Sequence, residues 1–114
     1  MRDIQFKKKY GQNFLKDDSI PKKIVAYSEI PEDTLVIEIG PGAGALTKEL
    51  APCCKQVLAY EIDDSLSSIL AVNLEPYSNI DIVYADFLTR DVKEDLKKYS
   101  YSHLYVIANL PYYI

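Results

Sequence analysis

The segment from Leu35 to Thr47, LVIEIGPGAGALT, decides the fold that this sequence predicts. It opens with an apolar, β-branched run that is typical of a buried parallel strand. Glycines follow at three alternate positions, Gly40, Gly42 and Gly44, and a helix-forming run begins at Ala45. Glycine is favoured where the backbone takes a positive φ or approaches a ligand closely, and a helix N-terminus presents free N–H groups. The segment therefore predicts a strand, a glycine loop and a helix that together form a cradle of nucleotide size.

The composition is that of one globular domain. The chain has 114 residues, of which 48% are hydrophobic and 26% are charged, and these values are ordinary for a soluble protein. No apolar run approaches the roughly 18 residues that a membrane span requires. The start of the chain leads into a lysine cluster rather than the apolar core of a secretory signal. We therefore expect a cytoplasmic protein without a membrane segment.

The two cysteines, Cys53 and Cys54, are neighbours in the sequence. Adjacent cysteines suit neither an ordinary disulfide nor a metal site, because no other Cys or His lies nearby. We expect plain thiols and no bound metal.

The charge is distributed unevenly along the chain. The net charge of −4 argues mildly against nucleic acid as a partner, since phosphate binding favours a basic face. The first quarter of the chain nevertheless holds six lysines, Lys7, Lys8, Lys9, Lys16, Lys22 and Lys23. The sequence thus predicts a basic N-terminal segment on an acidic body.

Apolar runs separated by breaking residues predict an alternation of helices and strands. The expected strands span residues 34–39, 56–61, 80–84 and 104–108. The expected helices span residues 20–28, 45–50 and 91–99, and a further one runs from a cap at 63–65 to about residue 74, with Leu66, Ile69, Leu70 and Leu74 on one face. This alternation predicts an α/β fold with a parallel, doubly wound sheet and right-handed crossovers.

Polar residues follow each predicted strand. The four strands end at the Gly40 loop, Glu61, Asp86 and Asn109, and ligands of such sheets bind beyond the C-terminal strand ends. Each residue also has a simpler interpretation as a solvated acid, a turn cap or a turn residue. Together they predict a ligand-binding crevice.

The glycine loop alone does not identify the ligand. Gly40-x-Gly42-x-x-Ala45 fits the looser dinucleotide fingerprint, and Glu61 stands about 20 residues further on, where that fingerprint has a ribose-binding acid. A nicotinamide or flavin dinucleotide and S-adenosyl-L-methionine are equally compatible with this pattern.

The sequence Asn109-Leu110-Pro111-Tyr112 favours methyl transfer to a nucleic-acid base. An exocyclic base amine is a poor nucleophile because its lone pair is delocalised into the ring. Acceptors such as the Asn109 side-chain oxygen and the Leu110 carbonyl would hold the N–H groups and favour a pyramidal nitrogen. Pro111 would fix the turn, and Tyr112 would offer a face on which a flipped base stacks. The alternative is a strand-end turn with a surface tyrosine.

Five ordered motifs resemble the ribosomal RNA adenine N6,N6-dimethyltransferase family, most closely its KsgA type. They are GQNFL at 11–15, EIGPGAGALT at 38–47, EID at 61–63, AD at 85–86 and NLPYYI at 109–114, and they span the whole chain. The resemblance implies a Rossmann-like class I methyltransferase that uses S-adenosyl-L-methionine to dimethylate two adjacent adenines in small-subunit ribosomal RNA during ribosome biogenesis. The related macrolide-resistance methylases of large-subunit RNA remain an alternative. So do a dinucleotide oxidoreductase and a non-catalytic RNA-binding relative of the fold.

The resemblance also implies residue roles in cofactor binding. The segment holding Gln12, Asn13 and Leu15 would close over the cofactor, and the glycine loop at Gly40, Gly42 and Gly44 would approach its methionine part. Glu61 would hold the ribose hydroxyls and Ile62 would lie against the adenine. Asp86 would bind the adenine amino group with Phe87 beside it, and Asn109 would sit between cofactor and target base. Negative potential from Glu38, Glu61 and Asp86 would suit the sulfonium cation.

Family members continue beyond the NLPYYI motif. We therefore expect residues 1–18 to be a basic, cofactor-closing segment and residues 19–114 to be the N-terminal half of the methyltransferase domain, with the sheet truncated after its fourth strand. Such a chain is expected not to methylate RNA alone. Its open edge at residues 104–108 is expected to self-associate, because an unpaired apolar strand is a template for association.

Overall fold

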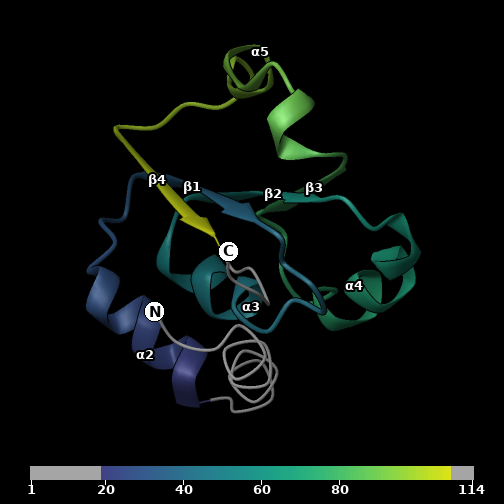
Figure 1. The fold of residues 1–114 in the computed structure, drawn as a ribbon. Coiled ribbons are helices and arrows are strands. Elements are labelled where there is room, and N and C mark those ends of the chain that lie inside the picture. Colours follow the sequence, from purple (N-terminus) through teal and green to yellow (C-terminus); the bar gives the residue numbers. More distant parts are fainter. Residues whose placement is uncertain (1–18, 109–114) are drawn as a thin grey trace, which may run out of the picture.

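The computed structural model describes residues 19–108, which form a four-stranded sheet with helices on both faces (Figure 1). The strands are β1 (Thr34–Ile39), β2 (Gln56–Glu61), β3 (Ile80–Tyr84) and β4 (His103–Ala108). All three pairings are parallel and the strand order is β3-β2-β1-β4. The predicted parallel, doubly wound sheet is confirmed, and the predicted strands agree with the observed ones to within one residue.

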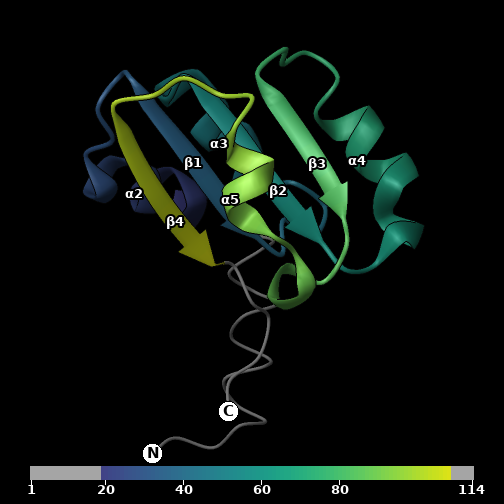
Figure 2. The ribbon, with the colours of Figure 1, turned by 90° about the horizontal axis from the view of Figure 1, so that it is seen from above.

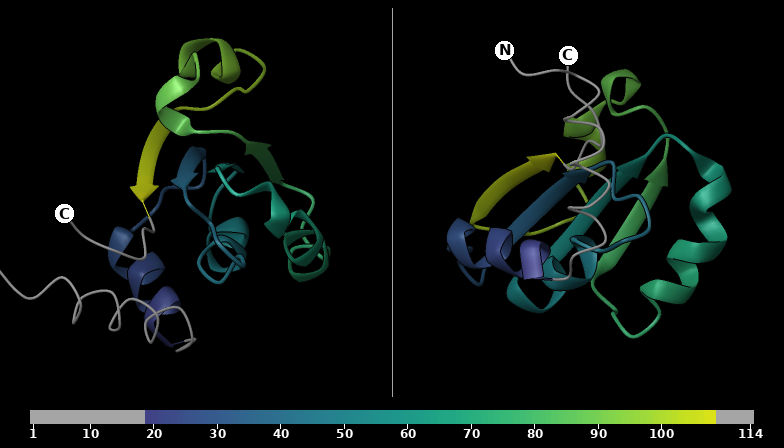
Figure 3. Two further views of the ribbon diagram at one scale, coloured as in Figure 1. Left: turned by 45° about the vertical axis from the view of Figure 1, so that its right-hand side comes forward. Right: turned by 60° about the horizontal axis from the view of Figure 1, so that its bottom comes forward.

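The helices divide between the two faces of the sheet (Figures 2 and 3). Helices α2 (Ser19–Ser28), α3 (Thr47–Leu50) and α4 (Ser67–Asn73) cover one face, and α5 (Val92–Leu96) covers the other. The described residues also form three short 3-10 turns. Turn η1 (Ala51–Cys53) follows α3, η2 (Asp64–Leu66) precedes α4, and η3 (Phe87–Thr89) lies between β3 and α5.

The predicted helices other than α2 are shorter than expected. Helix α3 begins only at Thr47, after the turn of the glycine loop, and it ends at Leu50 as predicted, with Pro52 in the 3-10 turn that follows. The apolar face predicted for α4 is wrong at Ile69, which is 45% exposed, whereas Leu70 is fully buried. The less exposed positions are spaced four residues apart, with Leu66 half-buried and Leu70 and Leu74 buried, so the buried face is narrower than predicted.

Two apolar clusters hold the layers together. On one face Val36, Val57 and Ala59 pack against Leu46 and Leu50 from the α3 region. On the other face a second cluster packs beneath α5 and consists of Leu35, Ile37, Leu58 and Tyr60. Because both faces are covered, β1 and β2 carry near-continuous apolar runs instead of an alternating pattern.

Strand β4 forms one edge of the described sheet. It pairs with β1, and its Tyr105 and Ile107 pack against the α2–α3 cluster. Leu104 and Val106 lie on the opposite face and are 43% and 57% exposed. Within residues 19–108 this edge has no second neighbouring strand.

The three loop glycines take the positive φ angles that the sequence predicted, 76° at Gly40, 60° at Gly42 and 93° at Gly44. A Cβ on Gly44 would lie 3.0 Å from Cδ2 of Leu74 and 3.3 Å from Cδ2 of Leu70, whereas a Cβ on Gly42 would meet nothing within 4 Å. Gly44 therefore serves both backbone conformation and the close packing of α4, and Gly42 serves backbone conformation alone.

We expect Gly44→Ala to lower the free energy of unfolding by about 2 to 4 kcal/mol, because it adds a steric clash to the cost of a left-handed alanine. Gly42→Ala is the matched control and should lose about 1 to 2 kcal/mol, since only the conformational cost applies. Urea titrations of the full-length protein measure both values. Equal losses would contradict the packing role of Gly44.

Candidate cofactor-binding site

A cavity of about 390 Å³ lies at the C-terminal ends of the strands. Every strand end contributes to its lining, which consists of Ile39, Gly40, Tyr60, Ile62, Ala85, Asp86, Phe87, Leu88 and Ala108. Its volume falls within the roughly 300–1,000 Å³ that is usual for small-molecule sites. Its position is the one at which parallel sheets bind ligands.

Four of the residues predicted to bind a cofactor line this cavity: Gly40, Ile62, Asp86 and Phe87. Ile62 is 70% exposed, and Leu88, which the sequence did not single out, is 87% exposed. Large apolar side chains that remain so exposed beside a cavity are available for contact with a planar apolar ring.

Asp86 both caps η3 and lines the cavity. One carboxylate oxygen, Oδ1, accepts a hydrogen bond from the Leu88 N–H at 3.0 Å, and the Asp86 carbonyl accepts one from the Thr89 hydroxyl at 2.8 Å. The turn-cap interpretation is therefore correct. It does not exclude a ligand, because an ionised carboxylate can accept further hydrogen bonds.

Glu61 is not part of the cavity lining and is only 6% exposed. Its Oε1 accepts a hydrogen bond from the Gly42 N–H and its Oε2 accepts one from the Asp63 N–H, each at 3.0 Å. The acid at the end of β2 thus fixes the glycine loop. Its contact with ribose hydroxyls stays a prediction.

Three successive loop residues have separate supports. Glu61 accepts a hydrogen bond from the Gly42 N–H, and Gly44 packs on α4. Between them, the Ala43 carbonyl accepts a hydrogen bond at 2.8 Å from the side-chain amide of Asn73. No sequence pattern pointed to Asn73, because it lies at the end of α4, 30 residues beyond its partner. Neither Gly42 nor Gly44 lines the cavity, so their predicted contact with a cofactor stays a prediction.

Glu38 is buried on the α3 side of β1. Its Oε1 accepts a hydrogen bond from the Thr47 hydroxyl at 2.5 Å, and its Oε2 has no hydrogen-bond partner among the described residues. Burial raises the pKa of Glu38 to about 7, with a further contribution from the charge of Glu61, although the Thr47 hydrogen bond opposes the shift. Glu38 therefore carries only part of a negative charge at neutral pH, less than the sequence argument assumed.

The remaining predicted site residues lie outside the described part of the chain. They are Gln12, Asn13 and Leu15 near the N-terminus, and Asn109, Leu110, Pro111 and Tyr112 after β4.

A second hollow of about 460 Å³ lies between α5 and β3. Its lining includes Asp81, Val83, Arg90, Asp95 and Tyr99. It is larger than the first cavity, but it lies along the middle of the strands instead of at their C-terminal ends. We therefore assign the ligand to the smaller cavity.

The structure also bears on the thiols, metals and membrane segments. Cys53 is exposed and Cys54 is half-buried, and both are free; burial raises the pKa of Cys54 to about 11. Within residues 19–108 no three His, Cys, Asp or Glu side chains are grouped as metal ligands would be. In the same range no helix is long and apolar enough to cross a membrane.

The fold, the strand-end cavity and the similarity to solved structures together place the chain in the class of Rossmann-like class I methyltransferases. Among solved structures, a dimethyladenosine transferase from Plasmodium falciparum superposes with a TM-score of 0.60 at 24% identity, covering 79% of this chain and 31% of that one. The 23S rRNA methyltransferase ErmE superposes with a TM-score of 0.60 at 43% identity, covering 65% of this chain and 30% of that one.

The particular family is the one described as ribosomal RNA adenine dimethylase, whose model matches residues 3–114, and the chain belongs to it. Proteins named ribosomal RNA small subunit methyltransferase A are 50% identical over 113 residues in Ligilactobacillus salivarius and 53% identical over 110 residues in Aster yellows witches'-broom phytoplasma. These alignments cover 97% and 95% of this chain. The chain spans 38% and 40% of the lengths of these relatives.

We expect the burial of Glu38 to make stability fall as pH rises. Its pKa of about 7 in the folded protein exceeds the ordinary value of 4.5, so the folded state holds a proton that the unfolded state releases. This stabilisation is complete below about pH 4.5 and is lost as the pH rises through about 7. Over this range the free energy of unfolding should fall by up to about 3 kcal/mol. Urea titrations between pH 5 and 8 should show this decline in the wild type and a flatter profile in Glu38→Gln. Parallel profiles would contradict it.

We expect Glu61→Gln to weaken both the fold and cofactor binding. A glutamine side chain offers one acceptor oxygen, so the N–H of either Gly42 or Asp63 loses its partner, at a cost of about 1 to 3 kcal/mol. Glu75→Gln, at an exposed position, is the control for the loss of charge. Thermal unfolding and calorimetric titration with S-adenosylhomocysteine measure the two effects. Wild-type affinity in a folded variant would remove Glu61 from the site.

Proposed function

We propose that this chain is the cofactor-binding part of an S-adenosyl-L-methionine-dependent methyltransferase that acts on the N6 amines of adenines in small-subunit ribosomal RNA. The observation that carries the proposal is that relatives about 50% identical over nearly the whole chain bear the name ribosomal RNA small subunit methyltransferase A. Dimethylation of two adjacent adenines and a place in ribosome biogenesis follow from the family resemblance.

The residues present suit this cofactor. Ile62 and Leu88 offer apolar surface for an adenine ring, and Asp86 offers an acceptor for its amino group. The glycine loop lets a ligand approach the backbone. Oε2 of Glu38, which has no hydrogen-bond partner among residues 19–108, adds an acceptor buried beside that loop. The bound cofactor would supply a methyl group on a sulfonium, open to direct in-line displacement without a metal or a covalent enzyme intermediate.

The position of Ala108 supports a role for Asn109 in holding the target amine. Ala108 ends β4 and lines the cavity, and Asn109 is the next residue in the chain. The side-chain oxygen of Asn109 and the carbonyl of Leu110 would accept the N–H groups of the adenine amine, while Tyr112 would stack on its ring. These residues would orient the nitrogen lone pair toward the methyl group.

A second candidate is methylation of large-subunit RNA. It is favoured by the 43% identity with the 23S rRNA methyltransferase ErmE over 65% of this chain. The small-subunit relatives match more of the chain at higher identity, so we place this candidate second. Membership of the dimethylase family argues against a dinucleotide oxidoreductase.

The remaining expectations concern location and partners. A cytoplasmic location and ribosomal RNA as the partner follow from the proposed reaction. The basic residues Lys7, Lys8 and Lys9 would contribute to RNA affinity by neutralising phosphates. Self-association through the β4 edge stays a prediction, and the exposure of Leu104 and Val106 supports it.

We expect the full-length protein to transfer labelled methyl groups from S-adenosylmethionine to unmodified small ribosomal subunits and not to large-subunit RNA. Asn109→Ala and Tyr112→Ala should lower the rate at least tenfold without unfolding the protein, because they remove the groups proposed to hold the base. Scintillation counting of the separated RNAs measures transfer. Label in large-subunit RNA alone would favour the second candidate, and near wild-type rates in both variants would contradict the amine-positioning role.

A further inference from the structure

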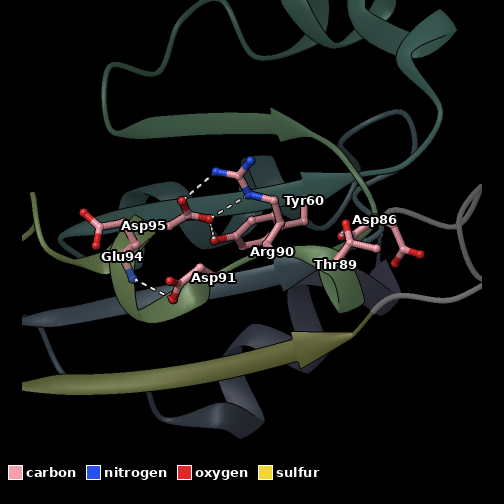
Figure 4. A network of polar contacts seen from close by, with 7 residues as sticks. All are labelled: Tyr60, Asp86, Thr89, Arg90, Asp91, Glu94 and Asp95. Carbon is pink, nitrogen blue, oxygen red and sulfur yellow. Dashed lines mark hydrogen bonds and ion pairs between the residues drawn. The ribbon is translucent and has the colours of Figure 1, made fainter.

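A polar cluster ties α5 to the floor of the proposed cofactor cavity (Figure 4). The Tyr60 hydroxyl donates a hydrogen bond to Oδ2 of Asp95 at 2.8 Å. Arg90 donates from Nε to Oδ2 at 3.0 Å and from Nη2 to Oδ1 at 2.6 Å. We call these three residues, Tyr60, Arg90 and Asp95, the brace.

The brace is joined at one end to a wall of the cavity. Arg90 directly follows η3, and its backbone N–H donates to the Phe87 carbonyl at 3.2 Å. Phe87 belongs to the cavity lining together with its neighbours Asp86 and Leu88. A bidentate pair holds a guanidinium in a fixed plane, so Asp95 fixes the end of the turn that carries this wall.

At its other end the brace sets the floor of the cavity. The Tyr60 ring lines the cavity and meets the Phe87 ring edge to face, with centroids 5.2 Å apart. The ring is almost fully buried, at 1% exposure. Its hydroxyl reaches Asp95, so that hydrogen bond fixes the ring against Phe87.

The charges in the brace favour this arrangement. The hydrogen bond from Arg90 holds the pKa of Asp95 below its ordinary value, so Asp95 stays ionised and accepts hydrogen bonds. Burial, followed by the bond to Asp95, raises the pKa of Tyr60, so its hydroxyl stays a donor.

Val92 and Leu96 also pack α5 against the sheet, and a hollow remains on the β3 side of this helix. The hollow of about 460 Å³ lies there, and Arg90 and Asp95 are part of its lining. Among residues 19–108, a further hydrogen bond from this region to the sheet joins the Tyr99 hydroxyl to Asp81 on β3, at 2.5 Å. That contact is made by β3 and not by the end of β2, so it provides a natural comparison.

We propose that Tyr60, Arg90 and Asp95 are positioning residues for the adenosine half of the cofactor, because they hold the cavity wall at Asp86, Phe87 and Leu88 in its binding position. This inference rests on the proposed cofactor and names residues to which neither the sequence motifs nor the family resemblance gave a role. The glycine loop, supported separately by Glu61 and Asn73, would serve the methionine half.

The test compares Tyr60→Phe and Asp95→Asn with Tyr99→Phe in the full-length protein. Tyr60→Phe keeps the ring and removes only the hydroxyl, and Tyr99→Phe makes the same change at the other tyrosine–aspartate contact. Calorimetry measures affinity for S-adenosylhomocysteine and for 5′-methylthioadenosine, which retains the adenosine half and lacks the amino-acid tail. Thermal unfolding measures stability in parallel.

We expect Tyr60→Phe to weaken the binding of both ligands by about three- to tenfold and by similar factors, as the loss of one hydrogen bond implies. Asp95→Asn also disrupts the bidentate pair with Arg90, so it should weaken both ligands at least as much. Tyr99→Phe should lower the melting temperature comparably and leave both affinities unchanged. If the brace residues only stabilised the fold, their substitution would not change the ligand affinity of the folded protein.

Two results would overturn the inference while leaving the proposed function in place. In one, the wild type binds both ligands and Tyr60→Phe binds them equally well, with only its stability reduced as in Tyr99→Phe. In the other, the brace variants lose affinity for S-adenosylhomocysteine but not for 5′-methylthioadenosine. A folded wild-type protein that binds neither ligand would overturn the proposed function and this inference together.

Discussion

The burial of β1 on both faces is the constraint on which the rest of the structure depends. Val36 faces the α2–α3 side and Leu35 and Ile37 face the α5 side, all with at most 2% exposure. A strand of this kind is stable only between two other strands and under helices on both faces. Its end therefore opens into the centre of the crevice, and the loop that leaves it must turn within a tightly packed space. Positive φ at Gly40, followed by close packing at Gly44, is the solution that the sequence uses.

The sequence predicted the strands better than the helices, for a physical reason. Apolar β-branched runs such as Leu35–Ile37 have one stable environment in a sheet covered on both faces. The helices are short and bury narrow faces, so the predicted face failed at Ile69 beside the buried Leu70. The sequence could place Asp86 at the strand-end cavity because strand ends converge in any parallel sheet, whereas Glu61 lies outside the cavity lining. Asn73 and Tyr60 were missed because their partners lie 30 and 35 residues away and leave no local pattern.

Two buried glutamates near the loop behave differently because of their hydrogen bonds. Glu61 accepts two backbone N–H bonds, which satisfy its charged form. Glu38 accepts one bond from Thr47, and its second oxygen has no partner among the described residues, so burial dominates and raises its pKa to about 7. Glu61, with a partner for each oxygen, supports the loop. Glu38 can gain or lose a proton near neutral pH, and a cation bound beside it would favour the loss.

The supports of the cavity fall into two groups that share few contacts. The glycine loop is held by the end of β2 through Glu61 and by α4 through Asn73, whereas the wall at Asp86 is held by α5 through Arg90 and Asp95. Tyr60 and Glu61 are adjacent on β2 and point to opposite faces of the sheet, since side chains alternate along a strand. The end of β2 therefore contributes to both groups of supports, with Glu61 holding the glycine loop and Tyr60 holding the wall at Asp86. This arrangement lets the two halves of an extended ligand be positioned by different layers of the fold, while the register of a single buried strand keeps them at a fixed separation.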